Sequence, residues 1–131
     1  MNLLVTGACG HIGSYLIDHI DKIRKISNIF LIDNFKSEKV SSLFRVKSKK
    51  KIHFILKDLK NPNSLNDLKK IDIVIHLASL TNAAGSFKNK KEMFENNLNS
   101  FQNVLDFCIK RKSKLIHISS TSIYGKSSGV V

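Results

Sequence analysis

Three glycines, Gly7, Gly10 and Gly13, follow a short apolar run at intervals of three residues, and no other feature of the chain constrains the fold as strongly. The run before them, Asn2–Thr6, has the pattern of a short buried strand. The apolar and aromatic positions that recur after them at helical spacing are Ile12, Tyr15, Leu16, His19, Ile20 and Ile23. The opening of the chain therefore predicts a strand, a glycine turn and a helix.

Four more apolar runs of strand length follow, at residues 28–33, 52–56, 72–77 and 115–119. Helical patterns separate them, so the strands are expected to be parallel and covered on both faces by helices. This alternation predicts a doubly wound α/β fold of the Rossmann type with strand order 3-2-1-4-5. Ligands bind such a sheet at the carboxyl ends of its strands, near the switch between the first and fourth strands.

The sequence predicts some of the helices between these strands more strongly than others. Residues 61–70 carry Pro62 near their start and predict a helix with Leu65 and Leu68 facing inward. A short helix is possible at residues 40–44, and residues 91–112 predict a long one. The apolar stripe of the long helix is formed by Met93, Phe94, Leu98, Phe101, Val104, Leu105, Cys108 and Ile109. Tyr15 and the phenylalanines are expected in the core rather than on a stacking platform.

Length and composition favour a single globular domain over residues 1–131, with 42% hydrophobic and 24% charged residues. No apolar run approaches the roughly 18 residues that span a bilayer, and no secretory signal is visible, which predicts a cytoplasmic protein with no membrane partner. Cys9 and Cys108 are far apart and are expected to be buried thiols. The histidines lack ligand spacing, so no metal is predicted.

The net charge of +12 raises the question of a polyanionic partner. The lysines form separate clusters around residues 47–51, 88–91 and 110–114, with few aromatic residues between them. The last cluster is also explained by the dipole at a helix C-terminus. The dispersed clusters predict no nucleic-acid binding.

The three glycines have a physical explanation at a strand end. The first permits a tight turn, the second lets a pyrophosphate approach the main chain, and the third lets helix and sheet pack closely. The helix N-terminus then offers free N–H groups to the anion. Asp33 ends the second strand, where a carboxylate accepts hydrogen bonds from ribose hydroxyls and would repel a 2′-phosphate. Together these residues predict a dinucleotide site that favours NAD over NADP.

Six segments in order resemble the extended short-chain dehydrogenase/reductase family, specifically its NAD-dependent nucleotide-sugar epimerases and dehydratases. The segments are VTGACGHIGS, LIDN, KDL, DIVIHLAS, ENNLNS and ISSTSIYG. The resemblance runs from Met1 to about Gly125, and the TGxxGxxG spacing of the first segment is typical of this family rather than of proteins with GxGxxG.

The resemblance implies roles for individual residues. His11 and Ile12 match the pyrophosphate contacts, Asp33 and Asn34 the adenosine-ribose contacts, and Asp58 and Leu59 the residues beside adenine. The loop under the cofactor's ribose corresponds to Leu77, Ala78, Ser79 and Thr81. Asn96 matches a helix asparagine that supports the cofactor, with its neighbour Asn97 as the alternative, and Ser120 matches the catalytic hydroxyl that binds the reacting sugar hydroxyl.

Plainer interpretations remain open at three of these positions. Asp58 is alternatively a solvated loop carboxylate, Asn96 a helix-surface residue, and Ser120 one of several hydroxyls in a serine-rich turn. Tyr124 matches a tyrosine that follows the fifth strand in the family and does not transfer the proton.

The family's catalytic YxxxK pair, in which a phenol takes the proton as hydride leaves, does not occur in this sequence. The resemblance therefore implies an N-terminal portion, truncated before the last strands and the substrate lobe and inactive by itself. In the complete enzyme the substrate would be a nucleotide sugar. The family also implies a homo-oligomer, because the long helix contributes to a dimer interface in relatives. A non-catalytic dinucleotide-binding or redox-sensing module is the alternative function.

Overall fold

A computed structural model describes residues 1–36, 48–68, 70–80 and 90–119 of the chain. Its elements follow the order β1 (Asn2–Thr6), α1 (His11–Asp18), the short 3-10 helix η1 (Ile20–Lys22), β2 (Asn28–Asp33), β3 (Lys51–Leu56), β4 (Ile73–His76), α2 (Lys90–Arg111) and β5 (Lys114–His117). The expected short helix at 40–44 lies outside the described residues.

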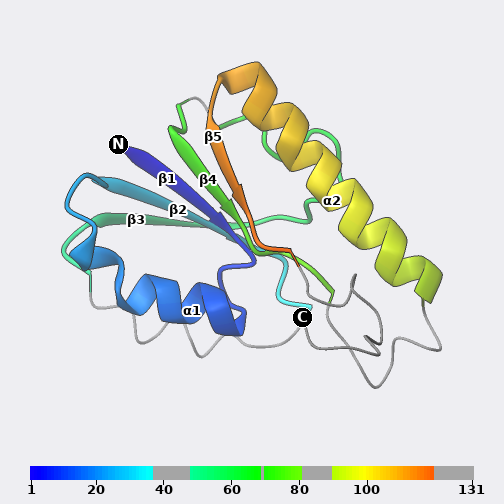
Figure 1. Ribbon diagram of the computed structural model, residues 1–131, viewed down its shortest axis with the longest axis horizontal. Helices are drawn as coiled ribbons and strands as arrows, with labels where there is room; N and C mark the ends of the chain where they lie inside the picture. Colours follow the sequence, from blue (N-terminus) through cyan, green and yellow to red (C-terminus); the bar gives the residue numbers. More distant parts are fainter. Residues whose placement is uncertain (37–47, 69, 81–89, 120–131) are drawn as a thin grey trace, which may run out of the picture.

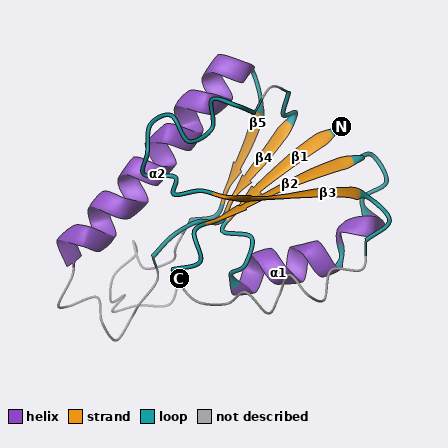
Figure 2. Cartoon of the chain, turned by 180° about the vertical axis from the view of Figure 1, so that it is seen from behind, coloured by secondary structure: helices purple, strands orange, loops and turns teal. Residues whose placement is uncertain are grey.

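The five strands form one parallel sheet with the order β3-β2-β1-β4-β5, which confirms the predicted topology. The chain alternates between strand and helix, so α1 lies on one face of the sheet and α2 on the other (Figure 1). Figure 2 shows the same arrangement from behind, with the strands fanning apart toward their amino ends. The sheet thus has a carboxyl edge and an amino edge at opposite ends of the domain.

Alternate side chains of β1 pack into two separate hydrophobic cores, one on each face of the sheet, because successive side chains of a strand point to opposite faces. Leu3 and Val5 pack with Ile17 and Ile20 on the α1 side. Leu4 packs on the α2 side in a cluster that includes Val104, Phe107 and Cys108 of α2. Each buried strand is apolar on both faces, which is why its sequence reads as a continuous apolar run.

The inward face of α1 differs from the predicted stripe. Ile17 and Ile20 are buried, whereas Ile12 is 59% and Tyr15 68% exposed. Tyr15 stacks on His19 with 4.3 Å between ring centroids, so the prediction of a core tyrosine was wrong. The physical reason is the close approach of α1 to the glycine loop at the buried Gly13, which sets the rotation of the helix about its axis.

Only part of the predicted stripe of α2 faces the sheet. Its buried residues are Asn96, Ser100, Val104, Phe107 and Cys108. Phe94, Leu98 and Ile109 are 65%, 49% and 69% exposed, so the phenylalanines are not uniformly core residues. Small polar side chains occupy the first buried turns because Asn96 and Ser100 line an open cleft beside this end of α2 rather than the apolar core.

The end of α2 has the hydrogen bonds of a Schellman motif. Lys112 adopts a left-handed conformation with φ 57°. Its N–H donates to the Ile109 carbonyl at 3.3 Å, and the Ser113 N–H donates to the Cys108 carbonyl at 2.9 Å. A lysine therefore occupies a backbone position that usually favours glycine.

The helix predicted over residues 61–70 is wrong. The chain there forms successive turns in which Ser64 N–H donates to Asn61 O and Asn66 N–H to Asn63 O, each three residues back. Asparagine and serine side chains compete with the backbone hydrogen bonds of a helix. Lys57 Nζ also donates to the Ser64 carbonyl at 2.7 Å, so this carbonyl has a partner outside the segment. Leu65 and Leu68 are nevertheless buried, as the apolar pattern predicted.

Among the described residues, no helix has both the length and the apolar character needed to cross a membrane.

Candidate functional site

The glycine loop joins β1 to α1 at the carboxyl edge, and two of its glycines are required by the backbone. Gly7 has φ +67°, and a Cβ there would lie 2.7 Å from the backbone N of Ala78 after β4. A Cβ on Gly13 would lie 2.5 Å from Gly7 O and 2.6 Å from Ala8 O. Gly7 lets β1 and the β4 loop touch, and Gly13 lets α1 pack on the loop.

Gly10 differs from the other two because, among the described residues, a Cβ there would meet only Gly7 O, at 3.2 Å. The residue lines the open cleft beside the N-terminus of α1. The fold therefore leaves a bare stretch of main chain facing the cleft, where a ligand can approach more closely than a side chain would allow. The N-terminus of α1, whose dipole favours a bound anion, borders this stretch.

Asp33, at the end of β2, has both carboxylate oxygens fixed by backbone donors. Oδ2 accepts from the Cys9 N–H at 2.8 Å, and Oδ1 accepts from the Phe35 N–H at 2.9 Å. Phe35 donates from a left-handed conformation with φ 56°. These contacts hold the carboxylate in one position, and each oxygen retains a lone pair for a further donor such as a ribose hydroxyl.

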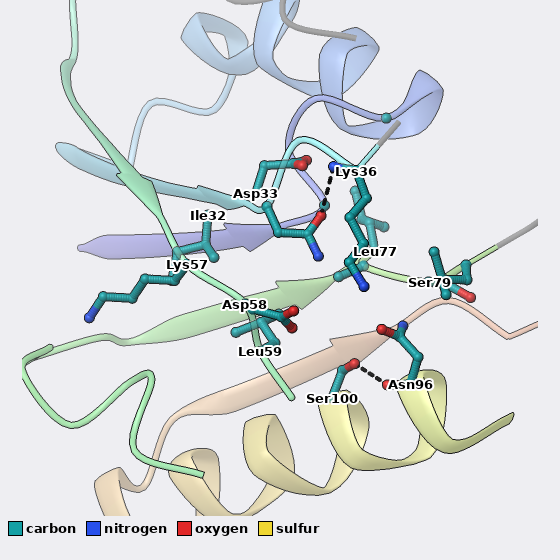
Figure 3. A pocket seen from close by; sticks show the side chains of 15 residues that line it. Ile32, Asp33, Lys36, Lys57, Asp58, Leu59, Leu77, Ser79, Asn96 and Ser100 are labelled. Atoms are coloured by element: carbon teal, nitrogen blue, oxygen red, sulfur yellow. Dashed lines mark hydrogen bonds between the residues drawn. The ribbon is translucent and has the colours of Figure 1, made fainter. Parts of the chain in front are cut away.

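A cleft with a volume of about 620 Å³, its open mouth included, lies between the glycine loop, the ends of β2 and β3, and α2. Figure 3 shows Asp33 and Asp58 on its strand side and Asn96 and Ser100 on α2 opposite them. Asp58 is held by the Lys60 N–H, which donates to Oδ1 at 3.0 Å. The Lys57 side chain is turned away from the cleft and donates to the Ser64 carbonyl and to Asp67.

Asn97 fixes the loop that follows β4. Its Oδ1 accepts from the Leu80 N–H at 2.8 Å, and its Nδ2 donates to the Leu80 carbonyl at 3.2 Å. Asn96 is 7% exposed, lines the cleft and donates to Asn97 Oδ1 at 3.2 Å. The two asparagines therefore have different positions: Asn96 faces the cleft, and Asn97 binds the backbone of the loop after β4.

A second hollow continues past the glycine loop toward β5. It shares five lining residues with the first cleft, namely Gly7, Gly10, Leu77, Ala78 and Ser79. The two hollows therefore form one groove across the carboxyl ends of β1 and β4, the switch point where such a sheet binds ligands. His76, Phe101 and His117 line the far part, with 5.5 Å between the two histidine ring centroids.

His76 is held neutral at the floor of this second hollow. The Thr6 hydroxyl accepts from the N–H groups of Leu77 and Ala78 at 3.3 and 3.4 Å, so its own proton points to His76 Nδ1, 2.7 Å away. Burial, with a smaller contribution from the charge of His117, lowers the pKa of His76 from 6.5 to about 4. The side chain is structural, as its position within a strand suggests.

The structure brings most of the predicted site residues to this groove. Those in the first cleft are Gly7, Gly10, Asp33, Asn34, Asp58, Leu59, Leu77, Ala78, Ser79 and Asn96, and those in the second include His11, Ile12 and Gly13. Thr81 and the predicted catalytic Ser120 lie outside the described residues. The sequence prediction missed Ser100 and Phe101, whose only signal was their nearness to motif residues.

The described residues fit a dinucleotide better than a metal. They contain no group of three or more histidine, cysteine, aspartate or glutamate side chains able to hold a metal ion. They do contain bare main chain at a helix N-terminus and a fixed carboxylate on the next strand. This pairing suits a diphosphate joined to a ribose.

Comparison with protein families gives a match over nearly the whole chain. The model of the NAD dependent epimerase/dehydratase family covers residues 3–130. A dTDP-D-glucose 4,6-dehydratase of Dictyostelium discoideum is 32% identical over 94% of the chain, which covers 30% of that enzyme. A UDP-glucose 4-epimerase of Yersinia enterocolitica is 30% identical over 96% of the chain, which covers 39% of that enzyme. The chain thus spans between 30% and 39% of the length of these two relatives.

Solved structures give the same result. A variant of the UDP-glucuronic acid 4-epimerase from Bacillus cereus, in complex with NAD and a fluorinated UDP-sugar, superposes with a TM-score of 0.86 and 33% identity. The match covers the whole chain and 44% of that enzyme. A dTDP-glucose 4,6-dehydratase of Streptomyces venezuelae, solved with NAD, has a TM-score of 0.88 but 20% identity over 99% of the chain and 42% of that enzyme, which supports the fold alone.

Proposed function

Because the chain belongs to the NAD-dependent epimerase/dehydratase family, we propose that it is the NAD-binding part of a nucleotide-sugar epimerase or dehydratase. The complete enzyme would oxidise a sugar hydroxyl to a transient ketone by hydride transfer. The observation that carries this proposal is Asp33, whose carboxylate is fixed by two backbone donors beside the bare main chain at Gly10.

The cofactor would lie along the groove with its diphosphate at the N-terminus of α1. Gly10, His11 and Ile12 would face the diphosphate, and the Asp33 carboxylate would accept the hydroxyls of the adenosine ribose. Asp58, on the neighbouring strand end, would accept the exocyclic amino hydrogen of adenine. Bound NAD supplies the hydride acceptor, and these residues supply binding and orientation.

The nicotinamide half would extend into the second hollow, under the loop that carries Leu77, Ala78 and Ser79. Asn97 supports this position because it ties that loop to α2 through both polar atoms of Leu80. Asn96 faces the first cleft and would contact the cofactor from the α2 side. In this proposal Asn97 is a positioning residue and Asn96 a binding residue.

The chemical step requires more than this chain offers. Ser120 would hold the reacting sugar hydroxyl, but the sequence has no YxxxK pair to take its proton. Loss of a positioned acid–base group lowers rates by about 10²- to 10⁴-fold. We therefore expect no turnover of UDP-, GDP- or dTDP-sugars by the isolated chain, although it binds NAD.

The same proposal includes a homo-oligomer and a cytoplasmic location. The exposed Phe94, Leu98 and Ile109 give α2 an apolar outer surface, which favours packing against a second copy. Cys9 and Cys108 are buried and form no disulfide, which suits a reducing cytoplasm. Burial also raises the pKa of the Cys108 thiol to about 11.

Calorimetric titration with NAD tests the proposal on three proteins. The unmodified chain should bind NAD, and Asp33→Asn should weaken binding about tenfold or more because a charge-assisted hydrogen bond is lost. Asp18→Asn, an aspartate substitution on the exposed end of α1, is the matched control and should bind as the unmodified chain does. Absence of heat from folded, unmodified protein would refute the proposed cofactor site.

A further inference from the structure

The amino edge of the sheet gathers positive charge that is scattered along the sequence. Each helix ends there and each strand begins there, so segments distant in the chain become neighbours (Figure 1). We call the exposed basic residues at this edge, together with two exposed apolar residues among them, the amino-edge patch: Met1, Lys22, Ile23, Arg24, Lys25, Lys49, Lys51, Lys70, Lys112 and Lys114.

Hydrogen bonds tie the segments of this patch together. The Met1 ammonium donates to the Lys25 carbonyl at 3.0 Å. Lys50 Nζ donates to the carbonyls of Ile23 and Ile26 at 2.8 and 2.7 Å, which joins the start of β3 to the turn after η1. On the other side, Asn2 Nδ2 donates to the Lys70 carbonyl at 2.7 Å. The charges are therefore held on one continuous surface.

Helix dipoles explain only some of these cations. Lys112 follows the C-terminus of α2, and Lys22 ends η1, where a cation is favourable. Lys49, Lys51, Lys70 and Lys114 lie at or just before strand starts, where no such dipole requires them. Asp21 faces this surface but already accepts from Ser48 and from the Lys49 N–H, and Asp72 accepts from the Asn2 N–H at 2.6 Å.

Two exposed apolar side chains lie among these cations. Met1 is 45% and Ile23 42% exposed, and the hydrogen bond from Met1 to the Lys25 carbonyl places Met1 beside the turn that carries Ile23. Basic residues around exposed apolar side chains suit a surface of anionic headgroups above acyl chains. Binding of single-stranded nucleic acid would instead favour exposed aromatic residues, and the amino-edge patch contains none.

We propose that the amino-edge patch docks the protein on an anionic lipid surface. The lysines and Arg24 contact headgroup phosphates, and Met1 and Ile23 insert at the level of the headgroups. The cofactor groove lies at the opposite, carboxyl edge, so it remains accessible while the patch is occupied (Figures 1 and 2). This adds a peripheral membrane partner to a protein whose sequence alone predicted none.

Co-sedimentation with lipid vesicles tests the proposal. The purified protein should pellet with phosphatidylcholine vesicles that contain about one third phosphatidylglycerol, and not with phosphatidylcholine alone. Raising NaCl from about 0.1 M to about 1 M shortens the screening length from about 10 Å to about 3 Å and should release it.

Two double variants with equal change in net charge locate the surface. Lys22→Glu with Lys49→Glu should weaken partitioning at least about tenfold, because each basic contact contributes severalfold. Lys90→Glu with Lys91→Glu, at the start of α2 on the carboxyl edge, should change it less than about twofold. Ile23→Ser should weaken it about threefold through lost insertion.

Three results would overturn the proposal. The first is absence of the unmodified protein from the pellet with anionic vesicles. The second is an equal loss in the two double variants, which would indicate net charge rather than a defined surface. The third is tighter binding to a short DNA duplex than to the vesicles at the same salt concentration, which would identify the patch as a nucleic-acid surface.

Discussion

Acidification should destabilise the fold through a single buried imidazole, His76. The ring is 2% exposed, and its Nδ1 accepts the Thr6 hydroxyl proton, so the folded chain holds it neutral. Its pKa is lowered to about 4 in the folded protein, against 6.5 for an unperturbed histidine. The unfolded chain therefore binds more protons in this range, and stability must fall as the pH falls.

The magnitude follows from the two pKa values. A difference between 6.5 and about 4, at about 1.4 kcal/mol per pKa unit, corresponds to about 3 kcal/mol. This stabilisation is fully present above pH 6.5 and is lost progressively as the pH falls to about 4. Asp21 and Asp67 also have lowered pKa values, through hydrogen bonds to Ser48 and Lys57, but they titrate below 3.8 and so act at lower pH.

Urea unfolding at a series of pH values between about 4 and 7 measures this loss. His76→Asn keeps an acceptor near the Nδ1 position but cannot ionise, so its stability should be lower at neutral pH and nearly independent of pH in the window. His53→Asn on β3 is the matched control, and it should retain the full pH dependence of the unmodified protein.

The reasoning would be refuted if His76→Asn kept the same loss of stability between neutral pH and pH 4 as the unmodified protein. It would also be refuted if the unmodified protein were equally stable at both values. Either result would mean that the imidazole is protonated in the folded state and that Thr6 does not donate to it.

Four further substitutions test contacts made by the backbone. Gly13→Ala should lower the free energy of unfolding by roughly 3 kcal/mol, since its Cβ would lie 2.5 Å from Gly7 O, whereas Gly10→Ala, at 3.2 Å from the same atom, should cost less in the same urea titration. Lys112→Gly should raise the stability by about 1 kcal/mol because it relieves a left-handed lysine, as a shift of the urea midpoint would show. Asn97→Leu should cost about 1 kcal/mol and speed hydrogen exchange at the Leu80 amide, since it removes both the acceptor of the Leu80 N–H and the donor to the Leu80 carbonyl.

The topology could be predicted from sequence because it depends on a coarse signal. Five apolar runs alternating with helical patterns permit few arrangements, and connection rules for parallel strands reduce them further. The rotation of α1 could not be predicted, since in a helix of eight residues Ile12 and Tyr15 fit an apolar face as well as Ile17 does. Contact between Gly13 and the loop decides between them, and that contact is tertiary.

The candidate site was predictable only as a set of positions. Strand ends place Asp33 and Asp58 at one edge whatever the details, so their nearness follows from topology. The hydrogen bond that fixes Asp33 Oδ1 depends on the left-handed backbone conformation of Phe35, and a phenylalanine does not predict that conformation. Asn96 and Asn97 differ by about 100° around α2, so only the placement of the helix shows which one faces the cleft and which one holds Leu80.

The same topology shows how lysine clusters that are dispersed along the sequence can lie together in space. In a doubly wound parallel sheet, every connection from strand to helix lies at the carboxyl edge and every connection from helix to strand at the amino edge. Dispersal along the sequence is therefore compatible with concentration in space, since segments as distant as Lys22, Lys70 and Lys114 occur at the same kind of connection. It follows that the cofactor groove and the amino-edge patch lie a full strand length apart, and NAD affinity should be the same with and without anionic vesicles.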